Sequence, residues 1–242
     1  MIAIFLNCFF NYFLSFEDRL EKFMQRRRLI HELRVLTKLG MQLNIVYDIG
    51  ARVGLWTKLI KTALPSAKFI CFEADDKCKN ALEKSSDKAL ICVLSDTNRQ
   101  LQFYRGTGTG DSYYLENSPF FKGVVPETIA AKTLESICIE NKLPSPDFIK
   151  IDTQGSELDI LKGGGEFLNN VKLVYLEISI LPCNRDAPLI STYIEQLLDY
   201  GFIPLRITEQ IKVQWALVQV DILFIKKELG NKYFGDVRGI CI

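Results

Sequence analysis

The chain has 242 residues, a net charge of +1 and 24% charged residues, values that suit one globular α/β domain with a sizeable core. This charge gives no electrostatic basis for nucleic-acid binding, which needs a concentrated basic face. The dense basic run at Arg26–Arg28 is expected on a solvated helix face. The seven cysteines are widely spaced and form no Cys-x-x-Cys pair. We therefore expect neither disulfides nor a metal site, and a cytoplasmic location.

The N-terminal segment Met1–Phe16 is strongly apolar. It lacks the charged leader and cleavage site of a signal peptide, and it is shorter than the ~20 residues that span a bilayer. We expect it to dock on the domain or on a partner, including a second copy, with interfacial membrane contact as the alternative. Ser15 is expected to cap a helix over Phe16–Leu39 that ends near Gly40. Residues 1–42 would precede a catalytic domain at 43–228, with a tail at 229–242.

A strand followed by a turn of small residues opens the domain. Apolar Ile45–Tyr47 predicts a buried parallel strand with Asp48 at its end, and a helix begins at Leu55. A carboxylate beside such a turn would repel a pyrophosphate but suits a ligand with an ammonium group and ribose hydroxyls, such as S-adenosylmethionine. An ordinary strand-to-helix turn is the alternative. The residues predicted to bind this cofactor here are Asp48, Gly50, Ala51 and Gly54.

Acidic residues also end the next predicted strands. Lys68–Glu73 places Glu73 19 residues after Gly54, close to the ~20-residue spacing at which an acidic residue reaches ribose hydroxyls. Two further strands are predicted over Ala89–Leu94 and Phe148–Asp152. Because ligands bind outside the carboxyl ends of such strands, these tips should form one site. We therefore add four residues to those predicted to bind the cofactor: Glu73, Ser95, Asp96 and Asp152.

The rest of the chain alternates helices with strands. Helices are expected near 55–64, 75–84, 133–141 and 188–200, with short strands at 99–105 and 112–116. The loop Gly106–Gly110 between those strands lacks the Lys-Ser/Thr pair of a P-loop, so we expect it near an acceptor pocket, with Tyr113 and Tyr114 as walls. The fifth strand is Leu173–Glu177. The last strands, at 203–207 and 217–226, have no helix between them, which favours an antiparallel pair.

The run FIKIDTQGSELDILKGG at Phe148–Gly164 resembles the signature of FkbM-type methyltransferases. Further segments follow in the order of that family: VYDIGARVG, CFEADD, VLSD, KTLES, LVYLEIS and QVDILFIKK. The resemblance covers Ile45–Lys227. The chain departs from the family pattern at Arg52, where Asn is expected, and at Ala74 and Gly164.

This resemblance implies a doubly wound Rossmann-like class I methyltransferase sheet that binds S-adenosylmethionine. Five parallel strands and an antiparallel terminal pair would follow the order 3-2-1-4-5-7-6, with an N-terminal helical extension. The methyl acceptor would be a small molecule or a glycan, methylated at a hydroxyl of a sugar or secondary metabolite.

Methyl transfer depends mostly on alignment, but an acceptor hydroxyl must also lose its proton. The single histidine, His31, is expected on a solvated helix face. We therefore predict Asp152 as the catalytic carboxylate, supported by Glu157 and Glu177 and oriented by Gln154. Glu157 could instead act only through the helix dipole. Asp152 and Glu177 could also hold a divalent cation, although no third ligand is evident and we favour a metal-free site.

Two other functional classes are compatible with the sequence. A nicotinamide-dependent oxidoreductase could use a similar sheet, but Asp48 and the missing third glycine count against it. A non-catalytic member could keep the fold and act as an assembly partner through Met1–Phe16. The combination of Asp48, Glu73 and Asp152 favours the methyltransferase.

Overall fold

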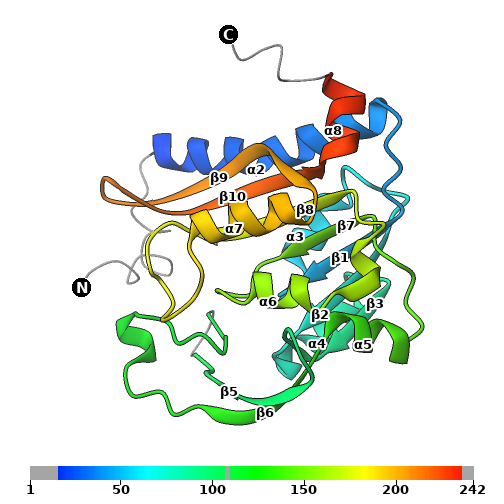
Figure 1. The fold of residues 1–242 in the computed structure, drawn as a ribbon. Coiled ribbons are helices and arrows are strands. Elements are labelled where there is room, and N and C mark those ends of the chain that lie inside the picture. The colour runs from blue at the N-terminus through cyan, green and yellow to red at the C-terminus, as the bar shows by residue number, and fades with distance from the viewer. Residues whose placement is uncertain (1–15, 107–109, 236–242) are drawn as a thin grey trace.

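A computed structural model describes residues 16–106 and 110–235 of the chain (Figure 1). Its main sheet has seven strands, and hydrogen-bonded neighbours follow one another in the order β3 (Lys88–Ile91), β2 (Lys68–Glu73), β1 (Ile45–Ile49), β7 (Phe148–Ile151), β8 (Leu173–Ser179), β10 (Ala216–Lys226) and β9 (Phe202–Val213). The first five are parallel, and β10 is antiparallel to β8 and β9. The predicted fold class and strand order are confirmed.

Helices cover both faces of this sheet because the central strands are apolar on both sides. One face carries α2 (Phe16–Lys38), α3 (Leu55–Ile60), α4 (Lys79–Glu83) and α8 (Lys227–Phe234), and the other carries α5 (Leu134–Glu140), α6 (Glu157–Lys162) and α7 (Ile190–Asp199). Phe69 of β2 packs with the α2 cluster, whereas Ile70 packs with α5 and α6. Single 3₁₀ turns lie at Asp76–Cys78, Pro119–Phe121 and Gly165–Leu168.

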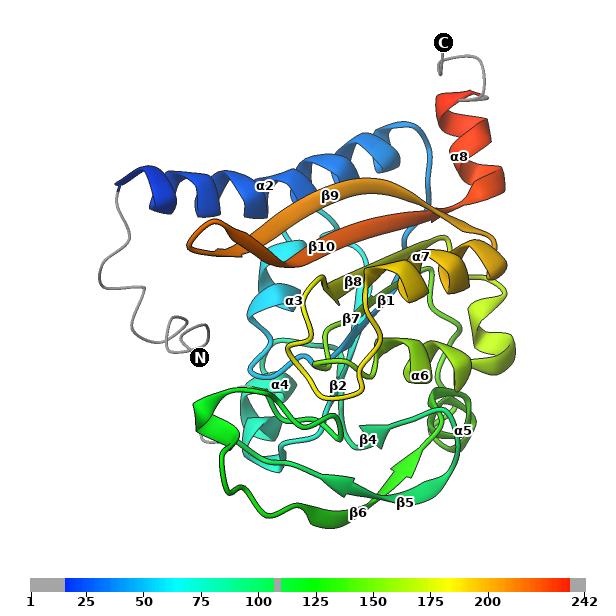
Figure 2. The same cartoon turned by 60° about the vertical axis from the view of Figure 1, so that its left-hand side comes forward.

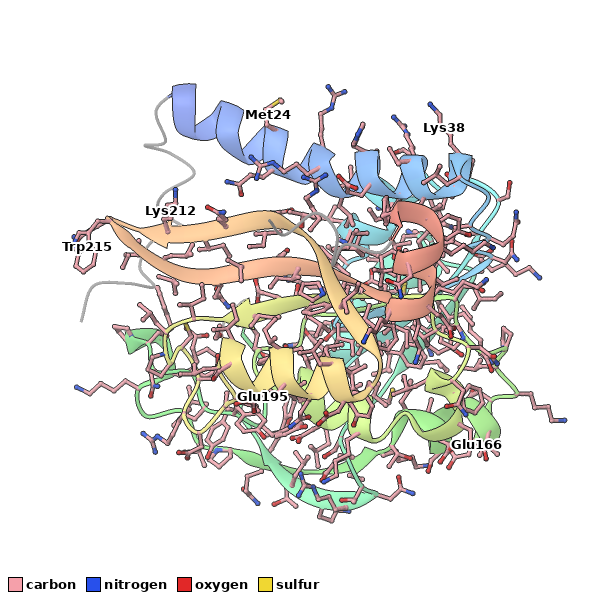
Figure 3. The ribbon with its side chains drawn as sticks, turned by 45° about the horizontal axis from the view of Figure 1, so that its top comes forward. Met24, Lys38, Glu166, Glu195, Lys212 and Trp215 are labelled. Atoms are coloured by element: carbon pink, nitrogen blue, oxygen red, sulfur yellow. The ribbon has the colours of Figure 1, made fainter. Side chains whose placement is uncertain are left out.

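The N-terminal helix α2 lies along β9, the edge strand of the sheet. The Gln210 backbone N–H donates to Gln25 Oε1 at 3.0 Å, and Arg206 forms an ion pair with Glu32 at 2.8 Å. These contacts protect an otherwise open edge. Met24 and Lys38 are exposed on the outer side of the helix (Figure 3), as is His31. The predictions for Met1–Ser15 fall outside the described residues.

A second, three-stranded sheet lies on the opposite side of the molecule from α2 (Figure 2). Its strands follow the order β4 (Val93–Leu94), β6 (Glu127–Lys132) and β5 (Arg99–Phe103). The strand predicted over 89–94 is therefore split at Cys92, because β3 pairs with β2 while β4 pairs with β6. Sequence reasoning missed β6, whereas Thr133 caps α5 as predicted by accepting from the Ser136 N–H at 3.0 Å.

The strand predicted at 112–116 is wrong, because that segment forms only isolated bridges from Ser112 to Tyr104 and from Glu116 to Asn184. Its backbone pairs with a loop instead, since the Arg185 N–H donates to the Leu115 carbonyl at 2.8 Å. Residues 227–234, most of which fall in the predicted tail, form α8. None of the helices among the described residues is long and apolar enough to cross a membrane.

Docking of α2 can be tested with a pair of leucines. Leu33 is fully buried, whereas Leu39 just after the helix is 47% exposed. Leu33→Ala should lower the free energy of unfolding by roughly 2–5 kcal/mol, the cost of a core cavity. Leu39→Ala should change it by less than about 0.5 kcal/mol, as surface substitutions usually do. Urea denaturation measures both, and equal losses would contradict the docking of this helix face.

Candidate active site

The turn between β1 and α3 depends on left-handed backbone at three positions. Gly50, Arg52 and Gly54 have φ of 72°, 50° and 74°. A Cβ on Gly50 would lie 1.9 Å from the Asp152 carbonyl oxygen, so only glycine allows β7 to approach this turn. Asn tolerates φ near 50° better than Arg does, which gives a physical reason for the Asn of the family pattern, whereas Arg52 adopts the same backbone conformation at a cost.

Glu73 lies beside this turn at the end of β2. Its Oε2 accepts a hydrogen bond from the Arg52 N–H at 2.6 Å, and its Oε1 accepts from the Ala74 and Asp75 N–H groups at 2.8 and 3.0 Å. The carboxylate is half-buried, and three of its roughly four acceptor positions are used. The structure therefore brings Glu73 together with Gly50, Ala51 and Gly54 at one rim.

A buried lysine that sequence reasoning missed joins the turn to β7. Lys150 is 4% exposed, and its Nζ lies 3.0 Å from the Gly50 carbonyl oxygen, 3.1 Å from Asp48 Oδ1 and 3.5 Å from Asp152 Oδ2. Burial alone would lower the pKa of Lys150, but the charges of Asp48 and Asp152 outweigh it and raise that pKa. A lysine inside an apolar strand was the available signal, because such a charge needs a buried partner.

Asp48 is fully buried and faces protein groups. Its Oδ2 accepts a hydrogen bond from Thr57 Oγ1 at 2.7 Å, and its Oδ1 faces Lys150. The carboxylate thus anchors α3 and the lysine at once. The contact between Asp48 and the cofactor stays a prediction.

Three carboxylates lie in neighbouring positions across β7, β8 and β10. Asp152 follows β7, Glu177 lies in β8, and Asp221 pairs with Glu177 in β10. Gln154 Nε2 donates to Glu177 Oε2 at 2.6 Å and to Asp152 Oδ1 at 3.3 Å, which is the orienting contact expected of it. Burial and the charges of Asp152 and Asp221 raise the pKa of Glu177. Burial, followed by the charge of Glu209, raises the pKa of Asp221 to about 8.

Glu157 plays a different part from the other two predicted catalytic carboxylates. It is 1% exposed, and its oxygens accept from the Thr153 N–H at 2.8 Å, from the Gly155 N–H at 3.1 Å and from the Tyr193 hydroxyl. Burial raises its pKa. These contacts hold the turn after β7, so the structure favours a positioning role over contact with substrate.

Ser95 and Asp96, at the end of β4, lie at a junction with β5 and α6. Asp96 forms ion pairs with Arg99 at 3.1 Å and Lys162 at 3.5 Å, and Ser95 Oγ donates to Asp96 at 3.1 Å. Burial would raise the pKa of Asp96, but the Ser95 hydrogen bond and these two cations lower it. Their contact with a cofactor stays a prediction.

The turn after β7 is covered by two loops that are hydrogen-bonded to each other. Ser112 Oγ donates to the Gln154 carbonyl at 3.0 Å, and Asn184 Nδ2 donates to the Tyr114 carbonyl at 2.9 Å. The hydroxyls of Tyr113 and Tyr114 both donate to Asp159 Oδ2 at 2.9 Å. These loops build the side of the rim where an acceptor pocket was expected. Residues 107–109 of the glycine loop fall outside the described part of the chain.

The chemical groups at the rim suit S-adenosylmethionine. The glycine turn presents backbone rather than side chains, and the half-buried carboxylates of Glu73 and Asp152 suit ribose hydroxyls and positive charge. Within residues 16–106 and 110–235, no group of three or more His, Cys, Asp or Glu side chains is arranged to hold a metal ion.

The family profile described as the Methyltransferase FkbM domain matches residues 48–204, which is more than half of the chain. The chain belongs to the FkbM methyltransferase family. The predicted resemblance is confirmed, and with it S-adenosylmethionine as the cofactor of this methyltransferase. The matched range contains the turn, the tips of β2 and β7, and both covering loops.

Two curated relatives are enzymes that transfer methyl groups. The chain is 26% identical over 189 residues to 2-O-methyltransferase NoeI of Sinorhizobium fredii, covering 69% of this chain and 78% of that protein. It is 25% identical over 153 residues to hexuronic acid methyltransferase AglP of Haloferax volcanii, covering 60% of each. Magnesium protoporphyrin IX methyltransferase (ChlM) of Synechocystis, solved with bound SAM, shares the fold with a TM-score of 0.50 at 10% identity, covering 88% of this chain and 85% of its own.

A pair of substitutions can separate two costs of replacing Gly50: the steric clash with the residue after β7, and the strain of a left-handed backbone. Gly50→Ala and Gly40→Ala both force a left-handed residue, which costs about 1–2 kcal/mol. Only at Gly50 does the new Cβ meet a backbone atom, because nothing lies within 4 Å of a Cβ at Gly40. Gly50→Ala should therefore lose at least about 1–3 kcal/mol more unfolding free energy than Gly40→Ala. Equal losses in chemical denaturation would show that β7 does not constrain the turn.

Proposed function

We propose that this chain is an S-adenosylmethionine-dependent O-methyltransferase whose acceptor is a sugar hydroxyl. The observation that carries the proposal is the position of Asp152. Its half-exposed carboxylate contacts Lys150, which also contacts the Gly50 carbonyl of the glycine turn. The same carboxylate accepts a hydrogen bond from Gln154, which also donates to Glu177. This position supports a role for Asp152 as the group that accepts the proton between the proposed cofactor and acceptor sites. Relatives named for 2-O-methylation and for a hexuronic acid acceptor support the choice of a sugar.

The residues that would hold the cofactor are those of the turn together with Glu73. Glu73 suits the ribose hydroxyls, because its carboxylate is already fixed at the turn by three backbone N–H groups. Asp48, Ser95 and Asp96 complete the proposed set. S-adenosylmethionine supplies an activated methyl group on a sulfonium.

The protein contributes alignment and a place for the proton. Asp152 would accept a hydrogen bond from the acceptor hydroxyl and take its proton as the hydroxyl oxygen becomes methylated. Gln154 keeps this carboxylate in place, since it donates to Asp152 and Glu177 together. Glu177, with its raised pKa, suits a hydrogen-bonding partner for a neighbouring sugar hydroxyl. The two covering loops would bound the acceptor.

Calorimetry with S-adenosylmethionine, S-adenosylhomocysteine and NAD separates this proposal from the two alternatives. An O-methyltransferase should bind the first two with micromolar affinity, and NAD weakly or not at all. Tight binding of NAD alone would favour an oxidoreductase. Binding of none of the three would favour a non-catalytic assembly protein.

Removing the Glu73 carboxylate should weaken cofactor binding. Glu73→Ala is expected to cost roughly 1.5–3 kcal/mol in the binding of S-adenosylhomocysteine, the contribution of a hydrogen bond to a charged group. Glu140→Ala is the matched control, because Glu140 is 49% exposed and pairs with Lys132 at the surface. Calorimetry measures both variants. Unchanged affinity in Glu73→Ala would remove this residue from the site.

Neutralising Asp152 should separate binding from chemistry. Asp152→Asn keeps the shape of the side chain, so S-adenosylhomocysteine affinity should survive while turnover falls by about 10²–10⁴, the usual range for a general base. The assay follows tritium from labelled S-adenosylmethionine into a panel of glycans that includes hexuronic acids. If the variant keeps full turnover on any glycan that the wild type methylates, another group takes the proton.

A further inference from the structure

We propose that Lys150 is a positioning residue that couples the cofactor turn to the catalytic carboxylate, an inference that rests on the proposed function. It is buried at the centre of the rim and is not part of the predicted site. Its ammonium group contacts the backbone carbonyl of Gly50 in the cofactor turn and the side-chain carboxylate of Asp152. One cation would therefore hold the two in a fixed relative position.

The strand register explains why these groups converge. Asp48 in β1 pairs directly with Lys150 in β7, so both side chains lie on the same face of the sheet. Gly50 and Asp152 directly follow the two strands, two residues after Asp48 and Lys150, so they lie on the same face as this pair. A slip of one residue would turn Lys150 to the opposite face, away from Asp48.

The contacts of Lys150 exceed what neutralising Asp48 requires. An ammonium group has three N–H donors, and the closest oxygens are those of the Gly50 carbonyl at 3.0 Å and Asp48 at 3.1 Å. The Ile49 carbonyl at 3.4 Å and Asp152 at 3.5 Å are the next two. A lysine that served Asp48 alone would not need to reach the carbonyls of Ile49 at the end of β1 and of Gly50 in the turn, together with the Asp152 carboxylate.

Asp48, the buried partner of Lys150, is itself anchored to α3. Asp48 accepts from Thr57 in α3, and Thr57 is fully buried. Thr57 of α3 thus fixes the Asp48 carboxylate, which contacts Lys150. The ammonium group of Lys150 also faces the Gly50 carbonyl and Asp152. Because the same ammonium group contacts the Gly50 carbonyl and the Asp152 carboxylate, a cofactor bound at the turn would change the electrostatic environment of Asp152 through Lys150.

The test compares Lys150→Met with the double variant Asp48→Asn/Lys150→Met. The single variant leaves a buried carboxylate without its cation and should lower the midpoint of thermal unfolding. The double variant removes both charges and should unfold close to the wild type. Lys61→Met is the control, because Lys61 forms a surface ion pair with Asp87 at 3.6 Å.

Two measurements then distinguish coupling from simple neutralisation. Calorimetry follows S-adenosylhomocysteine binding, and ¹³C NMR follows the change in the Asp152 carboxyl resonance when S-adenosylhomocysteine is added. If Lys150 couples the two groups, the folded double variant should bind S-adenosylhomocysteine about tenfold more weakly than the single variant Asp48→Asn, which controls for the proposed cofactor contact of Asp48. The Asp152 resonance of the double variant should also lose most of the response that the wild type and Lys61→Met show.

An affinity equal to that of Asp48→Asn, together with a wild-type Asp152 response in the double variant, would overturn the proposal, because Lys150 would then serve only to neutralise Asp48. Failure of the wild-type protein to bind S-adenosylhomocysteine would instead overturn the proposed function. The two failures are therefore distinguishable in the same set of titrations.

Discussion

The site depends on one pairing, that of β1 with β7, because this register places a lysine opposite an aspartate inside the sheet. Burying two charges is costly unless each finds its partner with good geometry. Here the cost is offset by the contact between Lys150 and Asp48, by the Thr57 hydroxyl and by the Gly50 carbonyl. The glycine turn, the start of α3 and the tip of β7 are all anchored to this pair.

Beyond that pair the rim becomes increasingly acidic toward β10. Asp152 follows β7, and Glu177 and Asp221 lie in the next two strands. Burial raises the pKa of both Glu177 and Asp221, reinforced for Glu177 by the charges of Asp152 and Asp221 and for Asp221 by the charge of Glu209. Amide and hydroxyl donors hold the row in place, since Glu177 accepts from Gln219 at 3.2 Å and Asp221 accepts from Tyr175 at 2.8 Å. In the proposed function, this row would supply hydrogen-bond partners to the sugar acceptor.

The acceptor side differs in construction from the cofactor side. The cofactor side is made of strand ends and a tight turn within the main sheet. The proposed acceptor side is made of two loops that pair with each other through the bridge between Glu116 and Asn184, and the hydroxyls of Tyr113 and Tyr114 tie one of them to Asp159 of α6. Loops of this kind change readily between relatives on a constant sheet, which suits a family with different acceptors.

The sequence by itself determined the sheet and the rim, because buried parallel strands are apolar runs and Asp48, Glu73 and Asp152 lie at their ends. Local patterns could not reveal β6, since ETIAAK has weak alternation, or the break at Cys92, where the chain passes to a second sheet. Only the tertiary structure decided that Glu157 faces Tyr193 and that Lys150 reaches the turn 100 residues away. Sequence periodicity indicates which face of a strand or helix a residue occupies. Contacts between distant segments depend instead on strand register and on the side chains of the neighbouring segment.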